Sequence, residues 1–380
     1  MKDLKICLVS DTVFDINGVS RFIQDFAIEA QKHNKKFTVI TSTKKSSRTI
    51  FPDIINIKPI FRMKMPFYKS LDLVFPNFFK IKAEIKNINP DLIHISTPGT
   101  VGLCALISAK ILKIPIVGIY HTDFPAYMYK NTKNKFVKWG TIKFLNYFYN
   151  SYCGLFLRSD EYFETLKIQL GFTDENLYLL KAGINIENFD KKFKDNSIWD
   201  RYKIDKNRFK VLYVGRISIE KNVDKLLNLW NEAKLKNAHL ILVGDKELKE
   251  TIKDDSITYL GRKIGLELSK IYASCDCFIF PSTTDTLGQV VMEAMASSLP
   301  VIVTTKGGPK TFVKKEFGYI VDIDSKNEVI DALMQLSKKD EEYFLKKNRA
   351  YEFMRDISIS HSFLDFWQKN GEIHKKLSQK

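Results

Sequence analysis

The feature that most constrains the fold of this chain is an alternation of short apolar segments with amphipathic ones, which runs through the chain twice. Short apolar runs predict buried strands, and apolar residues spaced three and four positions apart predict helices. In the first half the pattern predicts strands at 5–9, 37–41, 91–95 and 116–119, and helices at 19–30 and 100–112. In the second half it predicts strands at 209–214, 239–243, 277–280 and 300–303, and helices near 221–236, 265–274 and 288–298.

Strands that alternate with helices form parallel sheets covered by helices on both faces. The predicted fold class is therefore α/β, with two Rossmann-like doubly wound domains facing a central cleft at the carboxyl ends of their strands. A polar, lysine-rich stretch at 190–208 is interpreted as a linker, so the domains are predicted at 1–190 and 191–360. A last helix near 361–377 has no strand after it, and we expect residues 361–380 to pack back on the first domain.

Composition and cysteine usage exclude several other classes of protein. With 44% hydrophobic and 27% charged residues, the chain is unlike disordered, collagen-like or disulfide-stabilised proteins. Its five cysteines are an odd number without a CxxC pair, so we expect neither a disulfide framework nor a metal site. Cys275 and Cys277 are interpreted as buried cysteines, with a redox or metal pair as the alternative. The first residues lack a signal-peptide pattern and no apolar run approaches 18 residues, which predicts a cytoplasmic protein or one bound to a membrane face.

Positive charge is concentrated in the first part of the chain. The formal net charge is +16, and residues 1–150 hold 23 basic and 10 acidic residues, so +13 of the excess lies there. Such an excess indicates an anionic partner, either a membrane surface or a nucleic acid, although solubility alone also explains it. Because no nucleic-acid-binding motif accompanies the charge, we expect no nucleic acid partner and favour an anionic membrane.

Two basic stretches, 61–86 and 133–149, also carry bulky apolar residues. In the first, which includes Phe67, Asn77 can cap a helix with one apolar face made of Phe78, Ile81, Ile85 and Ile88. In the second, one helical face is made of Val137, Phe144, Leu145 and Phe148. Basic residues between apolar ones are typical of helices that lie in a membrane interface. The alternative, favoured for each helix alone, is an ordinary core helix with solvated lysines.

Loops at strand ends carry the candidate chemistry, because functional residues collect in such loops. Asn17-Gly18 ends the first loop and opens a helix, where a glycine lets a phosphate approach free backbone N–H groups. His121 follows the strand at 116–119, beside Asp123 and a proline-stiffened turn, and is a candidate for either a catalytic or a structural role. The chain has no GxGxxG motif after its first strand, so dinucleotide binding is not predicted.

Arg216 and Lys221 follow the first strand of the second domain and stand five positions apart across a turn. Together they supply two fixed positive charges, and a pyrophosphate is the ligand that needs both a guanidinium and an ammonium. An exposed basic turn is the alternative interpretation.

The loop after the strand at 277–280 is the richest in candidates. Asp285 lies in this loop and Glu293 eight positions later in the helix. Between them the backbone N–H groups at the helix start belong to Thr286, Leu287 and Gly288. Carboxylates beside anion-binding amides suit a sugar nucleotide, because hydroxyl groups donate to carboxylates and a phosphate accepts from amides.

These loops resemble glycosyltransferase family 4, whose members are retaining enzymes of the GT-B fold. The resemblance covers nearly the whole chain and is carried by Asp11 to Ser20, Pro90 to His94, Tyr120 to Tyr127, Gly183 to Asn185, Gly215 to Asn222, Leu242 to Asp245 and Phe280 to Pro309. The acidic pair Asp285 and Glu293 matches the family's acidic-x7-acidic motif. The run from Tyr120 to Tyr127 looks most like the branch of lipid-directed mannosyl-, glucosyl- and sulfoquinovosyltransferases.

The resemblance implies a role for each candidate residue. Arg216 and Lys221 would hold the donor diphosphate and stabilise the leaving nucleotide. Glu293 would accept from ribose hydroxyls and Asp285 from hydroxyls of the donor sugar, with Thr286, Leu287 and Gly288 at the donor between them. His121 would lie near the reacting centre, and Gly18 and Gly308 would let their loops approach the sugar phosphate.

The function that follows from the resemblance is a metal-independent, retaining transfer of a hexose, without a cofactor. The donor would be UDP-glucose, UDP-galactose or GDP-mannose, and the acceptor a membrane lipid or a lipid-linked glycan. Such an enzyme is expected in the cytoplasm, as a peripheral protein on the inner face of the cell membrane. The alternatives are a basic, non-enzymatic protein that binds a membrane or nucleic acid, and a sugar-nucleotide epimerase on the same fold.

Overall fold

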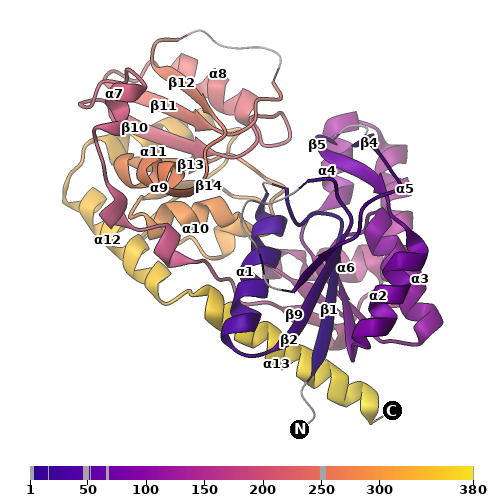
Figure 1. Ribbon diagram of the computed structural model, residues 1–380. Helices are drawn as coiled ribbons and strands as arrows, with labels where there is room; N and C mark the ends of the chain where they lie inside the picture. The colour runs from indigo at the N-terminus through magenta and orange to yellow at the C-terminus, as the bar shows by residue number, and fades with distance from the viewer. Residues whose placement is uncertain are drawn as a thin grey trace. The chain divides into compact units, whose positions relative to one another are not determined.

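The computed structural model describes residues 4–15, 17–45, 51, 53–65, 68–248 and 254–379. Phe67, which belongs to the basic stretch 61–86, lies outside the described residues. The chain divides into two compact units: the first comprises Met1–Gly183 and Ile359–Lys380, the second Ile184–Ser358. Each unit contains one parallel sheet, and Figure 1 shows the helices packed around these sheets.

The sheet of the first unit has seven strands in the order β3-β2-β1-β6-β7-β8-β9. The strands are β1 (Lys5–Ser10), β2 (Lys36–Thr41), β3 (Ile54–Asn56), β6 (Leu92–Ile95), β7 (Ile116–Tyr120), β8 (Gly154–Leu157) and β9 (Leu177–Leu179). All neighbouring pairs are parallel. A separate antiparallel hairpin is formed by β4 (Phe61–Met65) and β5 (Tyr68–Phe75). Because helices cover both faces of the sheet, its central strands are buried and mainly apolar, as the sequence predicts, with His94 of β6 as a buried polar residue.

Helices form two layers on this sheet. One hydrophobic core contains residues of α1 (Gly18–Lys32) and α13 (Ile359–Ser378). The other contains residues of α2 (Phe78–Ile88), α3 (Thr100–Leu112), α5 (Lys135–Tyr149) and α6 (Phe163–Leu170). The rings of Phe363 and Phe366 in α13 lie edge-on to Phe26 of α1, at 5.4 and 5.2 Å between centroids. The prediction that the last helix packs on the first domain is therefore confirmed (Figure 1).

The sheet of the second unit has six parallel strands in the order β12-β11-β10-β13-β14-β15. The strands are β10 (Phe209–Val214), β11 (Ala238–Val243), β12 (Ile257–Gly261), β13 (Cys277–Phe280), β14 (Val301–Thr304) and β15 (Gly318–Val321). The helices are α7 (Ile198–Arg201), α8 (Val223–Ala233), α9 (Gly265–Ser274), α10 (Gln289–Ala296), α11 (Lys326–Ser337) and α12 (Glu341–Arg355). Cys275 and Cys277 are both buried and free, which confirms the interpretation as buried cysteines.

The remaining elements are short. α4 (Phe124–Thr132) follows β7, and single 3-10 turns are η1 (Asp160–Tyr162), η2 (Asp174–Asn176), η3 (Ile186–Asn188), η4 (Lys191–Phe193) and η5 (Gly308–Thr311). Across the described parts of the chain, no helix combines the length and the apolar character needed to cross a bilayer.

Residues 190–208 are part of the second unit, contrary to their interpretation as a linker. The indole of Trp199 in this stretch is fully buried, and its Nε1–H donates to the carbonyl oxygen of Ser274 at 3.2 Å. The chain passes between the units at Gly183 and Ile184, and again at Ser358 and Ile359. The polar, lysine-rich composition of 190–208 arises because its buried anchors are few and its lysines lie on the surface.

The face of α5 that mixes basic and apolar residues is a core face for half of its members. Leu145 and Phe148 are buried, whereas Phe144 is exposed. The core alternative therefore holds for Leu145 and Phe148, and not for the exposed Phe144. For α2, Asn77 caps the helix by accepting from the backbone N–H of Lys80, and Ile81 and Ile85 are buried as predicted.

Candidate functional site

The loop after β10 carries Arg216 and is held in place by two glycines. A Cβ on Gly244, in the loop after β11, would lie 1.9 Å from the carbonyl oxygen of Gly215, so the two loops meet where only glycine fits. Both glycines also have positive φ, at +150° for Gly215 and +141° for Gly244. The hydroxyl of Tyr213 donates to the carbonyl oxygen of Arg216 at 2.7 Å. The backbone at Arg216 is therefore fixed at the carboxyl end of the sheet.

Lys221 and Asp285 form an ion pair across the ends of two neighbouring strands. Lys221 follows β10 and Asp285 follows β13, and these strands are adjacent in the sheet. The Nζ of Lys221 lies 2.7 Å from Oδ2 of Asp285. The structure thus brings together two of the residues that the sequence predicts for the donor site.

Glu220 lies between the two predicted cations. One of its carboxylate oxygens accepts from Nη2 of Arg216 at 3.0 Å. The other accepts from the hydroxyl of Thr284 at 2.6 Å and lies 3.3 Å from Nζ of Lys221. Glu247 adds a second carboxylate 3.7 Å from Nη1 of Arg216. Arg216, Glu220, Lys221, Thr284 and Asp285 together are called the charged cluster below.

Burial and charge oppose each other at the Lys221–Asp285 pair. Burial lowers the pKa of Lys221, but the carboxylates of Asp285 and Glu220 outweigh it, and the net pKa is raised. Burial raises the pKa of Asp285, but the ammonium of Lys221 outweighs it, and the net pKa is lowered. Both groups are therefore charged at neutral pH, and the cluster presents fixed charges of both signs.

The loop from Asp285 to Gly288 packs closely against the loop after β14. The backbone N–H of Gly308 donates to the carbonyl oxygen of Asp285 at 2.7 Å, and a Cβ on Gly308 would lie 1.9 Å from the carbonyl oxygen of Thr286. Gly288 has φ +72° and is the residue that precedes α10. Thr286 and Leu287 are buried between these glycines. The loop is thereby held rigidly at the start of α10, where the predicted amides lie.

Glu293 lies in α10 and is almost fully buried, with 3% of its surface exposed. Its Oε2 accepts from the hydroxyl of Tyr272 in α9 at 2.9 Å. Glu293 thus has a partner outside the charged cluster, and its contact with a ribose stays a prediction.

His121 lies at the carboxyl end of β7 in the first unit. Its Nε2 forms a hydrogen bond of 2.9 Å with the hydroxyl of Ser96, and its ring lies edge-on to Phe22, with 5.2 Å between centroids. Burial, then the charge of Arg158, then His94 lower its pKa well below the usual value, so the imidazole is neutral at neutral pH. The nearby Asp123 instead caps α4 by accepting from the backbone N–H of Ala126.

Gly18 is the first residue of α1, as the sequence predicts. The side chain of Asn17 caps the helix by accepting from the backbone N–H of Ser20 at 2.8 Å. Gly18 is exposed, so a ligand can reach its backbone N–H.

Sequence reasoning missed Glu220 and Thr284 as members of the charged cluster. Glu220 is directly followed by Lys221, a spacing that is also common on protein surfaces. The signal that could identify it is its place four residues after Arg216, which allows one carboxylate to reach both cations.

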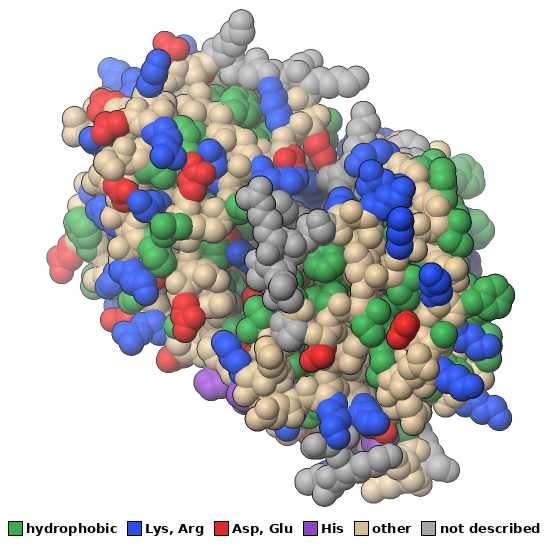
Figure 2. All heavy atoms as spheres, in the orientation of Figure 1, with side chains coloured by type: hydrophobic (Ala, Val, Ile, Leu, Met, Phe, Trp, Pro, Cys, Tyr) green, Lys and Arg blue, Asp and Glu red, His purple; other side chains and the backbone are tan. Residues whose placement is uncertain are grey.

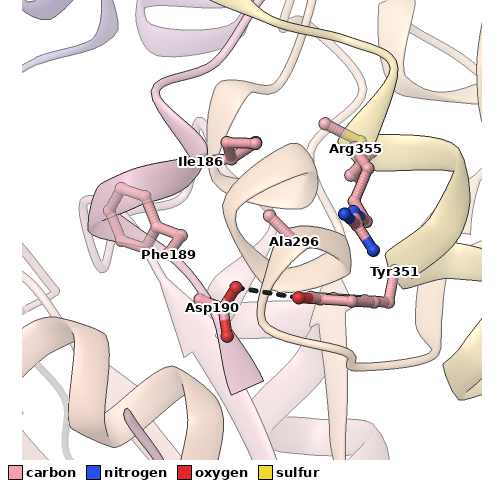
Figure 3. A pocket seen from close by; sticks show the side chains of 7 residues that line it. Ile186, Phe189, Asp190, Ala296, Tyr351 and Arg355 are labelled. Atoms are coloured by element: carbon pink, nitrogen blue, oxygen red, sulfur yellow. Dashed lines mark hydrogen bonds between the residues drawn. The ribbon is translucent and has the colours of Figure 1, made fainter. Parts of the chain in front are cut away.

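A cavity of about 220 Å³ lies elsewhere in the second unit (Figure 3). Its walls come from the segment 186–190, α10 and α12, and include Phe189, Ala296 and Arg355. The hydroxyl of Tyr351 donates to Asp190 at 2.8 Å across one side of it. None of the predicted site residues lines this cavity, so its chemistry is separate from that of the charged cluster.

Two family models match the chain. The model described as Glycosyltransferase Family 4 matches residues 16–188, and the model described as Glycosyl transferases group 1 matches residues 195–352.

Several curated proteins are similar in sequence. The sulfoquinovosyl transferase SQD2 of Arabidopsis thaliana is 35% identical over 251 residues, which are 64% of this chain and 48% of the relative, so the match spans about half the length of that relative. A GDP-mannose-dependent alpha-mannosyltransferase of Mycobacterium tuberculosis is 24% identical, over 92% of each chain. An alpha-monoglucosyldiacylglycerol synthase of Streptococcus pneumoniae is 26% identical, over 98% of this chain and 90% of the relative.

Solved structures with the same fold include Anabaena Alr3699/HepE in complex with UDP, at a TM-score of 0.72 and 17% identity over 99% of this chain and 100% of the other. A sucrose-phosphate synthase from Thermosynechococcus elongatus matches at a TM-score of 0.73 and 16% identity, over 99% of each chain. These similarities confirm the predicted α/β fold of GT-B type.

Proposed function

Because this chain belongs to glycosyltransferase family 4, we propose that it transfers a hexose from a nucleoside-diphosphate sugar to a membrane lipid or lipid-linked glycan. Among the relatives named above, one is named as GDP-mannose-dependent, one as a sulfoquinovosyl transferase and one as an alpha-monoglucosyldiacylglycerol synthase. These names support a nucleotide-sugar donor, and the proposed candidates are UDP-glucose, UDP-galactose and GDP-mannose. A non-enzymatic binding protein and an epimerase are not favoured, because the relatives are transferases.

The observation that carries this proposal is the charged cluster of the second unit. Arg216 and Lys221 supply the positive charge that a diphosphate needs, in the loop at the carboxyl end of β10, where ligands of α/β sheets bind. As the glycosidic bond breaks, negative charge grows on the leaving diphosphate. Cations that are already held in place by Glu220 and Asp285 stabilise this charge without reorganising, which is the main catalytic effect expected here.

We propose that the transfer proceeds with retention of the anomeric configuration and without a metal ion. The two cations of the charged cluster take the place of a divalent ion at the diphosphate. Asp285 is the proposed acceptor for hydroxyls of the donor sugar, and Glu293 for those of the ribose. His121, neutral because burial lowers its pKa, is proposed to lie near the donor sugar and to act through hydrogen bonds rather than through charge.

An exposed stripe on α5 supports attachment to a membrane surface. Phe136, Trp139 and Tyr147 are 85%, 62% and 65% exposed and stand at helical spacing on the face opposite to the buried Leu145 and Phe148. Exposure of aromatic side chains to water is unfavourable, whereas their insertion into a bilayer interface is favourable. We call Phe136, Trp139, Lys143 and Tyr147, with Ile107 and Lys110 of α3, the aromatic–lysine face.

Lysines accompany the aromatic rings of this face. The Nζ of Lys143 lies 5.9 Å from the ring centroid of Trp139, and that of Lys110 lies 5.8 Å from the ring of Tyr147. Between Asp91 and Asp160 the sequence has one acidic residue, Asp123, which is a helix cap. Figure 2 shows hydrophobic and basic side chains side by side along the edge of the first unit. Positive charge without acidic neighbours is complementary to anionic lipid, so we propose peripheral attachment at the cytoplasmic face.

The test of the proposed function is transfer of labelled sugar from UDP-glucose, UDP-galactose and GDP-mannose to lipid extract, with excess EDTA present. We expect turnover with one donor, an axial product linkage by NMR, and loss of turnover in Arg216→Met. Arg201→Met is the matched control, because Arg201 is an exposed arginine of the same unit that pairs with Glu267 outside the cluster. Turnover that needs a divalent ion would contradict the metal-free mechanism, and normal turnover in Arg216→Met would contradict the donor site.

A further inference from the structure

Arg158 has a buried guanidinium for which the described part of the chain provides no counter-ion. It directly follows β8 in the first unit and is 7% exposed. Among the described residues, none forms a hydrogen bond or an ion pair with its side chain, and its Nε–H is fully buried without a partner. The guanidinium carbon lies 4.5 Å from the ring centroid of Phe22, and burial lowers the pKa to about 10.

An unpaired buried charge of this kind is unfavourable in the free protein. Stacking on an aromatic ring compensates only part of the hydration free energy that a guanidinium loses on burial. In folded proteins, buried charges are almost always paired. An arginine that stays buried without a carboxylate is therefore expected to meet its counter-ion in a ligand.

The neighbours of Arg158 complete a polar row at the carboxyl end of the sheet. Strands β6, β7 and β8 are adjacent and parallel, and the last paired residues of β7 and β8 are Tyr120 and Leu157. The next residues along the two strands are His121 and Arg158, and both contact the ring of Phe22. Ser96, which follows β6, forms a hydrogen bond with His121. Three successive strand ends thus contribute a hydroxyl, a neutral imidazole and a guanidinium on the side of the sheet that faces α1.

We propose that Arg158 binds an oxyanion of the substrate, a phosphate, sulfonate or carboxylate group, with His121 beside it. A guanidinium binds such groups through two parallel N–H donors, which selects for anions over neutral sugars and lipids. The proposal rests on the proposed function for the substrate that carries the anion. The anion has two sources, the donor or the headgroup of the acceptor, and the second experiment below distinguishes them. Arg158 is then a specificity residue of the first unit.

The first experiment measures binding of inorganic phosphate and does not depend on turnover. Full-length protein carrying Arg216→Met, which removes a cation of the charged cluster, is melted with and without phosphate. The double variant Arg158→Met/Arg216→Met is expected to melt at the same or a higher temperature than Arg216→Met without phosphate, because an unpaired buried charge is removed. It is also expected to lose the stabilisation by phosphate. Arg349→Met is the matched control, since Arg349 is exposed on α12, and it should retain that stabilisation.

A structural role for Arg158 predicts the opposite pattern. In that case Arg158→Met melts at a lower temperature and phosphate stabilises it as much as the parent, which overturns the proposal. Because this readout uses no sugar or lipid, it stands even if the transfer reaction proposed above is not found.

The second experiment compares the unaltered enzyme with the single variant Arg158→Met. KM is measured for the donor and for two acceptors, a neutral diacylglycerol and a phosphate-bearing phosphatidyl lipid. A rise of ~10-fold in KM for the phosphatidyl lipid alone assigns the anion to the acceptor. A similar rise in KM for the donor with both acceptors assigns it to the donor. Unchanged KM values for donor and both acceptors would overturn the proposal.

Discussion

The ammonium group of Lys221 lies 2.7 Å from the carboxylate of Asp285, although the two residues are 64 positions apart in the sequence. This pair joins the start of α8 to the loop after β13, and Glu220 extends it to Arg216. The residues proposed to bind the donor thus also hold two loops of the sheet together.

Lys221→Met is expected to lower the free energy of unfolding by roughly 2–3 kcal/mol, because it leaves the carboxylates of Asp285 and Glu220 buried with one cation fewer. The double variant Lys221→Met/Asp285→Leu should recover most of this loss, since the remaining charge is removed with its partner. Both variants should be inactive. Urea unfolding of the three proteins tests this, and equal stabilities for the single and double variants would argue against the pair.

Glu220→Gln is expected to reduce transfer by about 10-fold or more, because Glu220 orients both Arg216 and Lys221. The amide keeps a hydrogen bond to Thr284 but loses the charge that positions the cations. Thr284→Val, which removes only the hydroxyl that donates to Glu220, should have a smaller effect. Steady-state kinetics with varied donor concentration measures the loss of transfer in each variant. A larger loss in Thr284→Val than in Glu220→Gln would contradict a positioning role for the charge.

Gly308→Ala is expected to destabilise the protein and weaken nucleotide binding, because its methyl group would lie 1.9 Å from the carbonyl oxygen of Thr286. The loop that carries Asp285 would have to move. Gly371→Ala is the control, since a Cβ there meets no other atom within 4 Å and lies in the middle of α13. It should raise stability by about 0.5–1 kcal/mol. Thermal melts with and without UDP and GDP measure both effects.

His94 is expected to make stability fall with acidification. Burial lowers its pKa to about 3, whereas the unfolded chain has a pKa near 6.5. Below pH ~6.5 the unfolded state therefore binds more protons, and stability decreases as the pH falls toward 3, by about 1.4 kcal/mol per pH unit for one histidine. Above pH ~6.5 this contribution is fully present.

Comparison of His94→Leu with the unaltered protein isolates this effect. The variant should lose less stability between pH 6 and pH 4 in urea unfolding, because it has one proton fewer to bind when unfolded. Identical pH dependence in His94→Leu and the unaltered protein would show that His94 is not held neutral.

Phe136→Ser/Trp139→Ser is expected to weaken binding to vesicles that contain anionic lipid by about 10-fold or more, because two exposed rings of the aromatic–lysine face are removed. Ile168→Ser is the control, since Ile168 is 81% exposed on α6 of the same unit but lies outside that face. Sedimentation with vesicles of phosphatidylglycerol and of phosphatidylcholine measures the binding. Equal binding of all three proteins would place the attachment elsewhere.

Strands such as β1, β7 and β13 were predictable because burial on both faces makes them mainly apolar. β8 was missed although all four of its residues are buried. The edge strands β3, β9 and β12 were not predicted. β3 and β9 are three residues long and β12 is only half-buried, so none of the three gives a clear apolar run. The helix α12 was missed because its many charged residues interrupt the apolar pattern. For α5, periodicity identified one face with apolar residues and missed the aromatic stripe opposite to it, because burial is decided by packing on the sheet, which sequence spacing does not contain.

At the candidate site, the sequence predicted which loops carry Arg216, Lys221 and Asp285, because each loop follows a recognisable strand. It did not predict the contact between Lys221 and Asp285, which depends on the adjacency of β10 and β13. Arg158 was missed for a different reason. A single arginine after a strand has no distinctive spacing, and its lack of a counter-ion is visible only once its surroundings are known.

The position of α13 has a consequence for biosynthesis. The core of the first unit includes Phe363 and Phe366, yet the 175 residues from Ile184 to Ser358 are translated before them. At a translation rate of about 5–20 residues per second, synthesis of these residues takes roughly 10 to 35 seconds. During this time Phe26 of α1 and Phe37 of β2 lack the rings of α13 that cover them in the folded protein. Chaperones that bind exposed aromatic surface therefore have a defined target on the nascent chain, and shortening the chain before residue 359 should yield a protein that aggregates rather than one that merely lacks a helix.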